Sequence, residues 1–457
     1  MSLRAIVLAA GRGTRMKSER PKVLFSVAGR PLVSWALDAV AGAGADEIVV
    51  VVGHGADQVR ARLPDGVRAV VQEPQLGTGH AVMTALAEMG EVAGDIILVV
   101  PGDTPLLQPG TLQALVAALS SAPAALLTTV MPDPTGYGRV LRDGPRVVGI
   151  VEHRDATAEQ RGITEVAVST YAFSGAALAG ALAGLGRGND QGEYYLTDAV
   201  AALAATGEVR GVPVADPAEV LGVNSPAQLA EVGAVMRRRL NAAWMEAGVE
   251  MVDPDRVYLD ATVMLEAGAR LYPGVHLEGR TTVAVGAEVG PDVFAVDSAI
   301  GPGSRVWYAV LRSAEVGEGV QVGPFASLRP GTRLEAGSKA GTFVETKNTV
   351  VGRGSKVPHL SYIGDTVIGE GTNVGAGTIT CNYDGRSKHR TVIGDRVFIG
   401  SDTMLVAPVR IGDEATIGAG SVITRDVAPG ALALERSEQR EVPGYAARKA
   451  NQAPKKE

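Results

Sequence analysis

Aliphatic side chains recur at every sixth position through much of the second half of this chain, and this period limits its possible folds more than any other feature. Gly, Asp, Glu, Ser and Thr fill many of the positions between them. Six residues at about 3.3 Å each make one short strand and a corner, so each repeat can form one flat side of a coil with its aliphatic residue inside. Three series carry the period: Leu259, Leu265, Leu271, Leu277, Val283 and Val289; Val316, Val322, Leu328, Leu334 and Ala340; Ile393, Ile399, Leu405, Ile411, Ile417 and Ile423. The pattern predicts a β-solenoid.

The period slips between the first and second series and again between the second and third. We expect loops to leave the coil at such slips. The stretch FVETKNTVVGRGSKVPHLSYIGD, residues 343–365, lies in the second slip. We therefore expect an irregular loop there, with His359 in it beside Tyr362.

A different pattern fills the first 225 residues. Short apolar runs at 5–9, 47–52 and 95–100 alternate with Ala- and Leu-rich helical patterns at 31–43 and 111–119. This alternation predicts βαβ units with a largely parallel sheet covered by helices. Residues 226–247 have helical spacing, as either a linker or a last helix packed on the first domain. The predicted domains are thus 1–225, a linker helix 226–247, a solenoid 248–437 and a tail 438–457.

Composition restricts the function classes. A chain of 457 residues is too long for one ordinary core, and its net charge of -7 argues against broad nucleic-acid binding. No apolar run approaches the roughly 18 residues that span a bilayer, and the apolar N-terminal run is too short for a secretory signal. The single cysteine, Cys381, excludes an internal disulfide framework. We expect a cytoplasmic protein without nucleic-acid or membrane partners.

The stretch LAAGRGTRM, residues 8–16, follows the first apolar run. A glycine-rich turn after a strand lets backbone N–H groups approach a phosphate chain, and nearby arginines balance its charge. Met16 breaks the G-x-G-x-x-G pattern, and no Gly-Lys-Ser/Thr follows, so neither the Rossmann fingerprint nor the Walker A loop fits. The loop indicates nucleotide binding of another kind.

Further short stretches follow in order: ERPKVLFSVAGRPL (19–32), QLGTGHA (75–81), PGDTPLL (101–107), DPTGYGRV (133–140), GIVEH (149–153) and GVNSP (222–226). This set is similar to the sugar-1-phosphate nucleotidyltransferase family, and the hexads resemble the left-handed parallel β-helix of the hexapeptide-repeat acyltransferases, which commonly form trimers. Together they resemble a family of bifunctional enzymes of UDP-N-acetylglucosamine biosynthesis. The implied fold is an α/β, Rossmann-like nucleotidyltransferase domain followed by the β-helix.

The resemblance implies that the first domain transfers UMP from UTP to N-acetylglucosamine-1-phosphate. Gln72, Gly77 and Thr78 would lie near the uracil, and Gly138 and Glu152 would contact the sugar. Arg15 and Lys22 would face the triphosphate as catalytic cations. The implied binding set is Leu8, Ala9, Ala10, Gly11, Lys22, Gln72, Gly77, Thr78, Asp103, Gly138, Glu152 and Asn224.

Asp103 and Asn224 are the implied Mg²⁺ ligands, and Asp103 closely follows the predicted strand 95–100, where open α/β sheets place ligand groups. The sugar phosphate would attack the α-phosphorus of UTP in line, and pyrophosphate would leave without a protein nucleophile. One position departs from the family. Ala167 stands where an Asn usually contacts the sugar, and a glycine is usual near Ser169, so the amide contact to the sugar is missing here.

The solenoid would transfer an acetyl group from acetyl-CoA to glucosamine-1-phosphate, with His359 as the general base. Imidazole titrates near neutrality, which suits that task. The resemblance places Arg329, Lys347, Tyr362, Asn373 and Glu345 around the sugar phosphate. It places Ala376, Asn382, Tyr383, Ser401, Ala419 and Arg436 along the acetyl-CoA groove. We also expect a homotrimer.

Other interpretations remain open from the sequence. Cys381 could be an acyl-enzyme nucleophile, although a small apolar filler is favoured because no adjacent base would lower its pKa. The solenoid could be an oligomerisation scaffold for a monofunctional nucleotidyltransferase, or the chain could be a regulator that binds nucleotide sugars without catalysis. The scaffold alternative is disfavoured because an oligomerisation scaffold has no need of Arg329, Lys347, His359 and Arg436.

Overall fold

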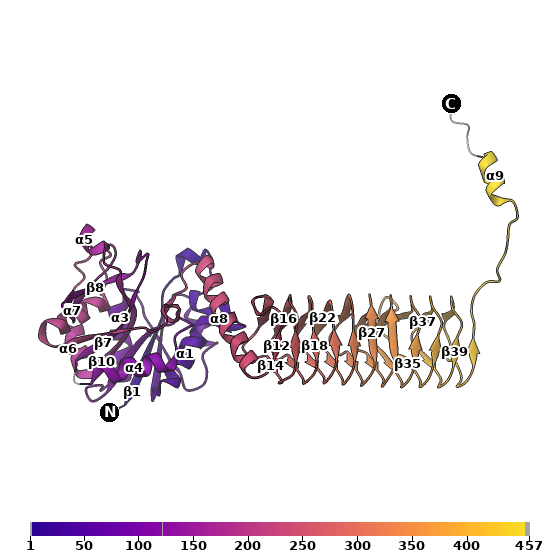
Figure 1. The fold of residues 1–457 in the computed structure, drawn as a ribbon, viewed down its shortest axis with the longest axis horizontal. Coiled ribbons are helices and arrows are strands. Elements are labelled where there is room, and N and C mark those ends of the chain that lie inside the picture. The colour runs from indigo at the N-terminus through magenta and orange to yellow at the C-terminus, as the bar shows by residue number, and fades with distance from the viewer. Residues whose placement is uncertain (1, 121, 453–457) are drawn as a thin grey trace. The chain divides into compact units, whose positions relative to one another are not determined.

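The first half of the chain folds around one nine-stranded sheet and the second half winds into a coil of short strands (Figure 1). This computed structural model describes residues 2–120 and 122–452. It divides the chain into two units, Met1–Leu240 and Asn241–Glu457. Each unit is described separately below.

The sheet of the first unit has the strand order β5-β4-β1-β6-β10-β7-β11-β9-β8. Its strands are β1 (Leu3–Ala9), β4 (Glu47–Val52), β5 (Arg68–Val71), β6 (Ile96–Pro101), β7 (Ala124–Val130), β8 (Gly138–Asp143), β9 (Arg146–Val151), β10 (Glu165–Ser174) and β11 (Val209–Pro213). Neighbours from β5 to β6 are parallel, and so are β7 and β11, whereas β10 and the β8–β9 hairpin pair antiparallel. The α/β prediction is confirmed.

Helices cover both faces of this sheet. Helices α1 (Leu32–Gly42), α2 (Ala56–Arg60) and α4 (Pro109–Leu119) pack on one face, with Val33, Val59 and Leu112 in its buried core. Helices α3 (Thr78–Met89), α6 (Gly175–Ala183) and α7 (Leu196–Thr206) pack on the other. A short hairpin of β2 (Ser26–Val27) and β3 (Arg30–Pro31) and a short helix α5 (Ala158–Arg161) complete the unit.

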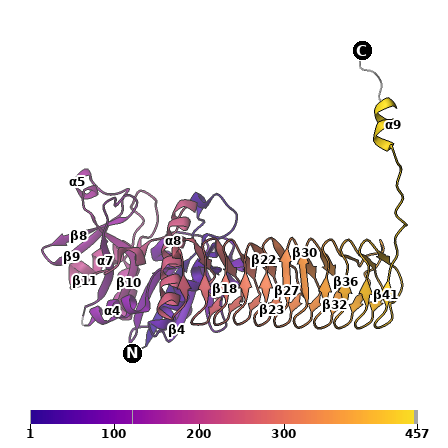
Figure 2. The ribbon, with the colours of Figure 1, turned by 45° about the vertical axis from the view of Figure 1, so that its right-hand side comes forward.

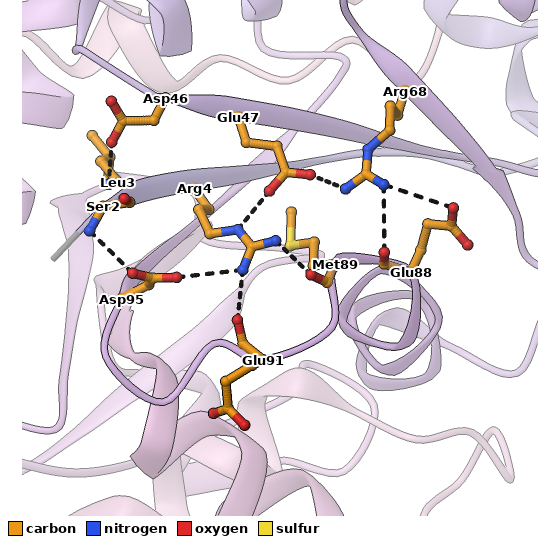
Figure 3. Close-up of polar contacts among 10 residues, drawn as sticks. All are labelled: Ser2, Leu3, Arg4, Asp46, Glu47, Arg68, Glu88, Met89, Glu91 and Asp95. Atoms are coloured by element: carbon orange, nitrogen blue, oxygen red, sulfur yellow. Dashed lines mark hydrogen bonds and ion pairs between the residues drawn. The ribbon is translucent and has the colours of Figure 1, made fainter.

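An ion-pair network fixes the amino-terminal ends of the central strands (Figure 3). Arg4 of β1 lies 2.6 Å from Glu47 of β4 and 3.3 Å from Asp95, which immediately precedes β6. The Asp95 carboxylate also accepts a 3.0 Å hydrogen bond from the backbone N–H of Ser2. Arg68 of β5 pairs with Glu47 in turn. These contacts engage the charged side chains at the edge where the strands begin. The edge where the parallel strands end is the one at which such sheets bind ligands.

Helix α8 (Pro226–Glu246) crosses the boundary between the two units. In the first unit, Val232 and Met236 pack against Leu32 and Leu106. In the second unit, the buried Asn241 side chain donates hydrogen bonds of 2.7 Å and 2.9 Å to the carbonyls of Pro254 and Val257. No helix in the described part of the chain is long and apolar enough to cross a membrane.

The second unit is a parallel coil in which each turn adds one strand to each of three sheets (Figure 2). The first sheet runs from β12 (Glu250–Met251) to β41 (Leu432–Ala433), the second from β13 (Val257–Leu259) to β40 (Val422–Ile423) and the third from β14 (Met264–Leu265) to β38 (Val409–Ile411). Every residue of the three aliphatic series is buried in the core between them. The β-solenoid prediction is confirmed.

The turns of the coil differ in length at their corners. Lys339 pairs with Gln321, 18 residues earlier, Lys356 with Lys339, 17 earlier, and Gln321 with Arg305, 16 earlier. Residues in left-handed backbone conformation make such corners, among them Phe343 at φ 56° and Leu360 at φ 48°. A shortened corner shifts the sequence period but keeps the strands paired.

Two expectations about the period slips were therefore wrong. No loop leaves the coil at the first slip, where the strands continue to pair. His359 does not lie in an irregular loop either, because it ends the regular strand β30 (Lys356–His359), which pairs with β27 (Lys339–Thr342). A segment does leave the coil within the second slip, at residues 382–390, between β34 (Ile379–Cys381) and β35 (Thr391–Ile393).

The tail beyond the coil is exposed and contains helix α9 (Tyr445–Gln452). The predicted tail 438–457 extends past it, and its residues 453–457 lie outside the described residues.

Candidate active sites

The parallel strands β5, β4, β1 and β6 end at one edge of the sheet, and residues that follow them line a cavity of about 880 Å³. Leu8 pairs with both Val51 and Pro101, so the strand ends lie level. The cavity brings together predicted UTP residues from distant segments: Leu8, Ala9, Ala10, Gly11, Lys22, Gln72, Gly77, Thr78 and Asp103. Open α/β sheets place their ligands at this edge.

Gly13 shapes the loop that brings Lys22 to the cavity. Its φ of 61° lies in the left-handed region, and a Cβ atom on Gly13 would lie 2.7 Å from Lys22 Cβ. Only glycine permits this close approach. The glycine-rich loop thus has two effects: it lets Lys22 pack closely against Gly13, and it leaves the backbone accessible to the ligand.

Lys22 joins the two predicted metal ligands. Its ammonium forms an ion pair with the Asp103 carboxylate and donates a 2.9 Å hydrogen bond to Asn224 Oδ1. Asp103 follows β6, whereas Asn224 precedes α8, yet their oxygens converge on one cation. The described residues hold no cluster of three or more His, Cys, Asp or Glu side chains that could bind a metal. A carboxylate and an amide oxygen together suit a hard cation that takes its other ligands from phosphate and water.

The predicted sugar contacts lie apart from the residues that line this cavity. Ala167 of β10 pairs with Gly138 of β8, and a Cβ atom on Gly138 would lie 3.7 Å from Glu152 Oε1. Glu152 follows β9 and lines a second cavity of about 290 Å³. Burial raises the pKa of the Glu152 carboxyl, although Thr197 donates a 3.3 Å hydrogen bond to it. Ser169, near which the resemblance implies a glycine, adopts a φ of 56°, a conformation that favours glycine.

The structure does not bring Arg15 into the cavity. It lies exposed on the turn η1 (Thr14–Met16), outside the lining residues. Sequence reasoning also missed lining residues, of which Gly53 and His54 directly follow β4 and Gln75 belongs to the quoted QLGTGHA stretch. Gln75 Nε2 donates a 2.8 Å hydrogen bond to the carbonyl of Ala10. The rule that ligand groups follow parallel strands would have found Gly53 and His54.

In the second unit, a charged cluster lies on the second sheet of the coil. Glu345 and Tyr362 stand at paired positions of β28 (Glu345–Lys347) and β31 (Tyr362–Gly364). Arg329 lies 2.8 Å from Glu345, and Lys347 follows on the same strand. Of the residues predicted for the sugar phosphate, the structure thus groups Arg329, Glu345, Lys347 and Tyr362. Asn373 lies on β33 (Asn373–Val374) of the first sheet, paired with Lys356.

The loop 382–390 brings Lys388 to this cluster. The nearby Lys347 ammonium is the main cause that lowers the pKa of Lys388. Asp384 accepts hydrogen bonds from the backbone of Arg386 and Ser387 and pairs with His389 at 2.7 Å, which holds the loop's shape and lowers the pKa of its carboxyl. Two ammonium groups beside each other, with Arg329 close by, suit a dianion such as a phosphate monoester. Sequence reasoning missed Lys388.

The predicted acetyl-CoA residues follow one corner of the coil. Asn373, Phe398 and Thr416 pair on successive turns, so Ala376, Ser401 and Ala419, three residues further on, form a column. His359 holds the equivalent position one turn earlier, three residues after Lys356. Arg436 donates a 3.0 Å hydrogen bond to the carbonyl of Ala419 at the far end. The column gives an extended ligand a path along the corner towards His359.

The remaining groove residues lie where the loop leaves the coil. Asn382 is buried and donates a 2.5 Å hydrogen bond to Asp365, whereas Tyr383 is exposed. Cys381 is half-buried, and burial raises the pKa of its thiol. A thiol with a raised pKa is a poor nucleophile, which favours the filler interpretation over an acyl-enzyme.

Comparison with known proteins finds matches to both units of the chain. The family models of the MobA-like NTP transferase domain and of the bacterial transferase hexapeptide (six repeats) match residues 5–144 and 390–425. A Heliobacterium modesticaldum protein named "Bifunctional protein GlmU" is 48% identical over 97% of this chain and 98% of its own length. Proteins of that name from Kineococcus radiotolerans and Alkalilimnicola ehrlichii are each 51% identical, over 96% and 97% of this chain and 91% and 96% of their own lengths.

The fold and the two sites define a sugar-phosphate nucleotidyltransferase joined to a hexapeptide-repeat acyltransferase. The sequence identities extend over nearly the full chain, so the chain belongs to the GlmU family of bifunctional proteins. It is a bifunctional uridylyltransferase and acetyltransferase. The family membership favours this function over a monofunctional nucleotidyltransferase and over a regulator without catalysis.

Proposed function

We propose that the second unit acetylates glucosamine-1-phosphate with acetyl-CoA, and that the first unit then transfers UMP from UTP to the resulting N-acetylglucosamine-1-phosphate. The observation that carries this proposal is the presence of one phosphate-suited cationic site in each unit. Lys22 lies with Asp103 and Asn224 in the first unit, and Lys347 lies with Arg329 and Lys388 in the second.

In the uridylyl site, the phosphate oxygen of the sugar phosphate attacks the α-phosphorus of UTP, and the bond to pyrophosphate breaks. The backbone at residues 8–11 holds the nucleotide at the strand ends, and Lys22 balances the charge that develops on pyrophosphate. Arg15 would reach the leaving phosphates from η1. Glu152 and Gly138 orient the sugar.

The nucleotidyl transfer would use Mg²⁺, which we assign to Asp103 and Asn224. Their convergence on the Lys22 ammonium is the supporting observation, because the same two oxygens already accept a cation. Bound there, Mg²⁺ would neutralise phosphate charge during the displacement. With another cation at Asp103, Lys22 would be available to the triphosphate.

In the acetyl site, the sugar amine attacks the thioester carbon, the C–S bond breaks, and CoA leaves as the thiol. His359 accepts a proton from the amine at an imidazole nitrogen and returns it to the departing sulfur. Arg329, Lys347 and Lys388 hold the sugar phosphate, with Glu345, Tyr362 and Asn373 around the sugar. The pantetheine arm follows the column of Ala376, Ser401 and Ala419, and Asn382, Tyr383 and Arg436 complete the groove.

We further propose that the chain forms a homotrimer, with acetyl-CoA between coils of different chains. The support is an exposed aromatic ladder on successive corners of the coil. Tyr308 and Phe325 lie 5.5 Å apart between ring centroids, and Phe325 and Phe343 lie 5.3 Å apart. More than half of Phe325, Phe343 and Leu360 is exposed. Contiguous exposed apolar patches mark association surfaces.

One incubation tests the two reactions separately. The enzyme receives UTP, acetyl-CoA, Mg²⁺ and glucosamine-1-phosphate, and CoA and pyrophosphate are followed as distinct products. We expect CoA to appear first and pyrophosphate to follow it. EDTA should stop pyrophosphate release and leave CoA release intact. Pyrophosphate release from N-acetylglucosamine-1-phosphate without any acetyl transfer would support the scaffold alternative instead.

A further inference from the structure

Gln72 lies at the end of β5, and its side chain is held in one orientation. The residue is only 4% exposed, and its amide nitrogen Nε2 lies 2.9 Å from the carbonyl oxygen of Gly77 and 3.1 Å from His80 Nδ1. A carbonyl only accepts hydrogen bonds, so the group facing it is the NH₂ and not the oxygen of the amide. The second N–H of that NH₂ then points to His80 Nδ1, which accepts it with its lone pair.

The carboxamide oxygen of Gln72 is left for the ligand. No donor to Oε1 is found among the described residues, and this oxygen is not among the fully enclosed atoms without a partner. Gln72 lines the 880 Å³ cavity, and Oε1 is the part of its amide that no described donor engages, so this oxygen is the group available to a ligand there. A fixed acceptor there matches a base edge that carries an N–H. Uracil has such an N–H at N3, whereas cytosine has a lone pair at the same atom.

We infer that His80 is a positioning residue that keeps the Gln72 oxygen turned into the cavity and thereby selects uracil over cytosine. This inference rests on the proposed uridylyl site. Without the Nδ1 acceptor, the amide loses one of its two anchors and can rotate, which would present an N–H to the base instead.

The surroundings of His80 are built to hold its ring. His80 lies in the first turn of α3, and the ring stacks on Tyr194 at a centroid distance of 6.3 Å. Gly79 N donates a 2.8 Å hydrogen bond to the carbonyl of Tyr194, and Leu196 N donates one of 3.1 Å to Thr78 Oγ1. The segment that carries Tyr194 is thus fastened to the start of α3, so the imidazole has a fixed place beside Gln72.

Two substitutions separate the acceptor from the ring. His80→Phe keeps an aromatic ring against Tyr194 but removes the acceptor. His80→Asn removes the ring but retains an oxygen that can accept from Gln72. We would measure kcat/KM for UTP and for CTP with N-acetylglucosamine-1-phosphate and Mg²⁺. The expected result is that His80→Phe lowers the preference for UTP about tenfold or more, and that His80→Asn keeps it within about threefold of the wild type.

Combination with Gln72→Leu supplies the matched control. Gln72→Leu alone should lower the preference, and His80→Phe added to it should change nothing more, because both act through one oxygen. Thermal unfolding followed by circular dichroism reports whether the first unit of each variant is folded, and His80→Ala replaces His80→Phe if the latter does not fold. An unchanged UTP preference in His80→Phe, or a loss in His80→Asn alone, would overturn the inference. Absence of uridylyl transfer in the wild type would instead refute the proposed function.

Discussion

At the scale of single residues, both sites depend on close approaches that a sequence pattern only suggests. The glycine-rich loop predicts a phosphate site, but the structure shows that Gly13 also gives Lys22 its place. In the coil, a Cβ atom on Gly364 would lie 2.6 Å from Tyr362 Oη and 2.7 Å from Asn382 Nδ2. Gly364 therefore lets a proposed sugar contact and a proposed acetyl-CoA contact lie side by side.

Gly364→Ala should disturb acetyl transfer and spare uridylyl transfer. The added methyl group must displace the Tyr362 hydroxyl and the Asn382 amide, so we expect kcat/KM for acetyl transfer to fall about 10- to 100-fold. CoA release with varied glucosamine-1-phosphate and acetyl-CoA measures this. Gly180→Ala in α6 is the control, because the added methyl group meets open space there. Gly337→Ala is unsuitable as a control because Gly337 has a positive φ. Normal acetyl transfer by Gly364→Ala would argue against the assigned positions of these two side chains.

The raised pKa of Glu152 should appear in the pH dependence of sugar binding. Burial raises it above the ordinary value of 4.5, so the carboxylate that would accept a sugar hydroxyl becomes protonated at a higher pH than in an exposed glutamate. We expect KM for N-acetylglucosamine-1-phosphate to rise as the pH falls through this raised pKa. Glu152→Gln should raise KM and flatten the profile. A wild-type KM that stays constant down to pH 4.5 would contradict the role of Glu152.

At the scale of elements, the coil is stabilised by hydroxyls that bond between its turns. Ser355 is fully buried, donates a 2.6 Å hydrogen bond to the carbonyl of Gly369 and accepts one of 2.8 Å from Thr372 N. Ser304 makes the same pair of contacts with Gly317 and Val320. Such side chains satisfy backbone groups at corners, where strand pairing is interrupted.

Ser355→Ala should destabilise the second unit. It leaves one buried N–H and one buried carbonyl without their partner, which costs about 1–3 kcal/mol in free energy of unfolding. Denaturant unfolding monitored in the full chain measures the change. Ser437→Ala, at an exposed position, serves as the control and should have no effect. Equal stability of the two variants would show that water replaces the lost contacts.

The sequence was most informative where the geometry repeats. Buried positions of the coil follow from the period of six because each flat side needs one inward aliphatic residue. The corners could not be predicted in the same way. Leu360 and Phe343 adopt left-handed backbone that their residue types disfavour, so the sequence suggested a loop where strands continue. His359 stays a candidate catalytic residue, and the expectation that it lies in an irregular loop was wrong because it ends strand β30. Lys388 was missed because only the fold of residues 382–390 brings it to Lys347.

The site of the first unit was predictable to a similar degree. Motifs after strands were found, and the structure brings most of them to one cavity. Hydrogen-bond partners such as His80 for Gln72 could not be read from the sequence, because they depend on how a helix start and a strand end face each other.

At the scale of the whole molecule, the two chemistries should be separable. His359 and Asp103 lie in different units. His359→Ala removes the proposed base and should lower acetyl transfer about 10²- to 10⁴-fold while uridylyl transfer persists. Asp103→Ala should do the reverse. Both half-reactions are measured on both variants, with N-acetylglucosamine-1-phosphate supplied directly. Loss of both activities in a folded His359→Ala protein would refute two independent sites.

Assembly should depend on the exposed aromatic ladder. Phe343→Asp places a charge among stacked rings, so we expect the proposed trimer to dissociate and acetyl transfer to fall, with uridylyl transfer retained. Light scattering measures the mass of the wild type and the variant. Met264→Asp changes another exposed apolar residue of the coil, on β14, and provides the comparison. A wild-type monomer that is active in acetyl transfer would refute the trimer.

The unequal turns of the coil also bear on how such a chain can change over generations. A corner can lose or gain a residue while the flat sides keep their pairing, as the 16-, 17- and 18-residue spacings show. Insertions and deletions should therefore accumulate at corners, and a longer segment such as residues 382–390 can add a binding group without changing the strand pairing of the coil. The hexapeptide family model matches only residues 390–425, where the period is uninterrupted, although strand pairing of the coil begins at Glu250. Related proteins are therefore better compared in this part of the molecule by which strands pair on successive turns than by the six-residue sequence period.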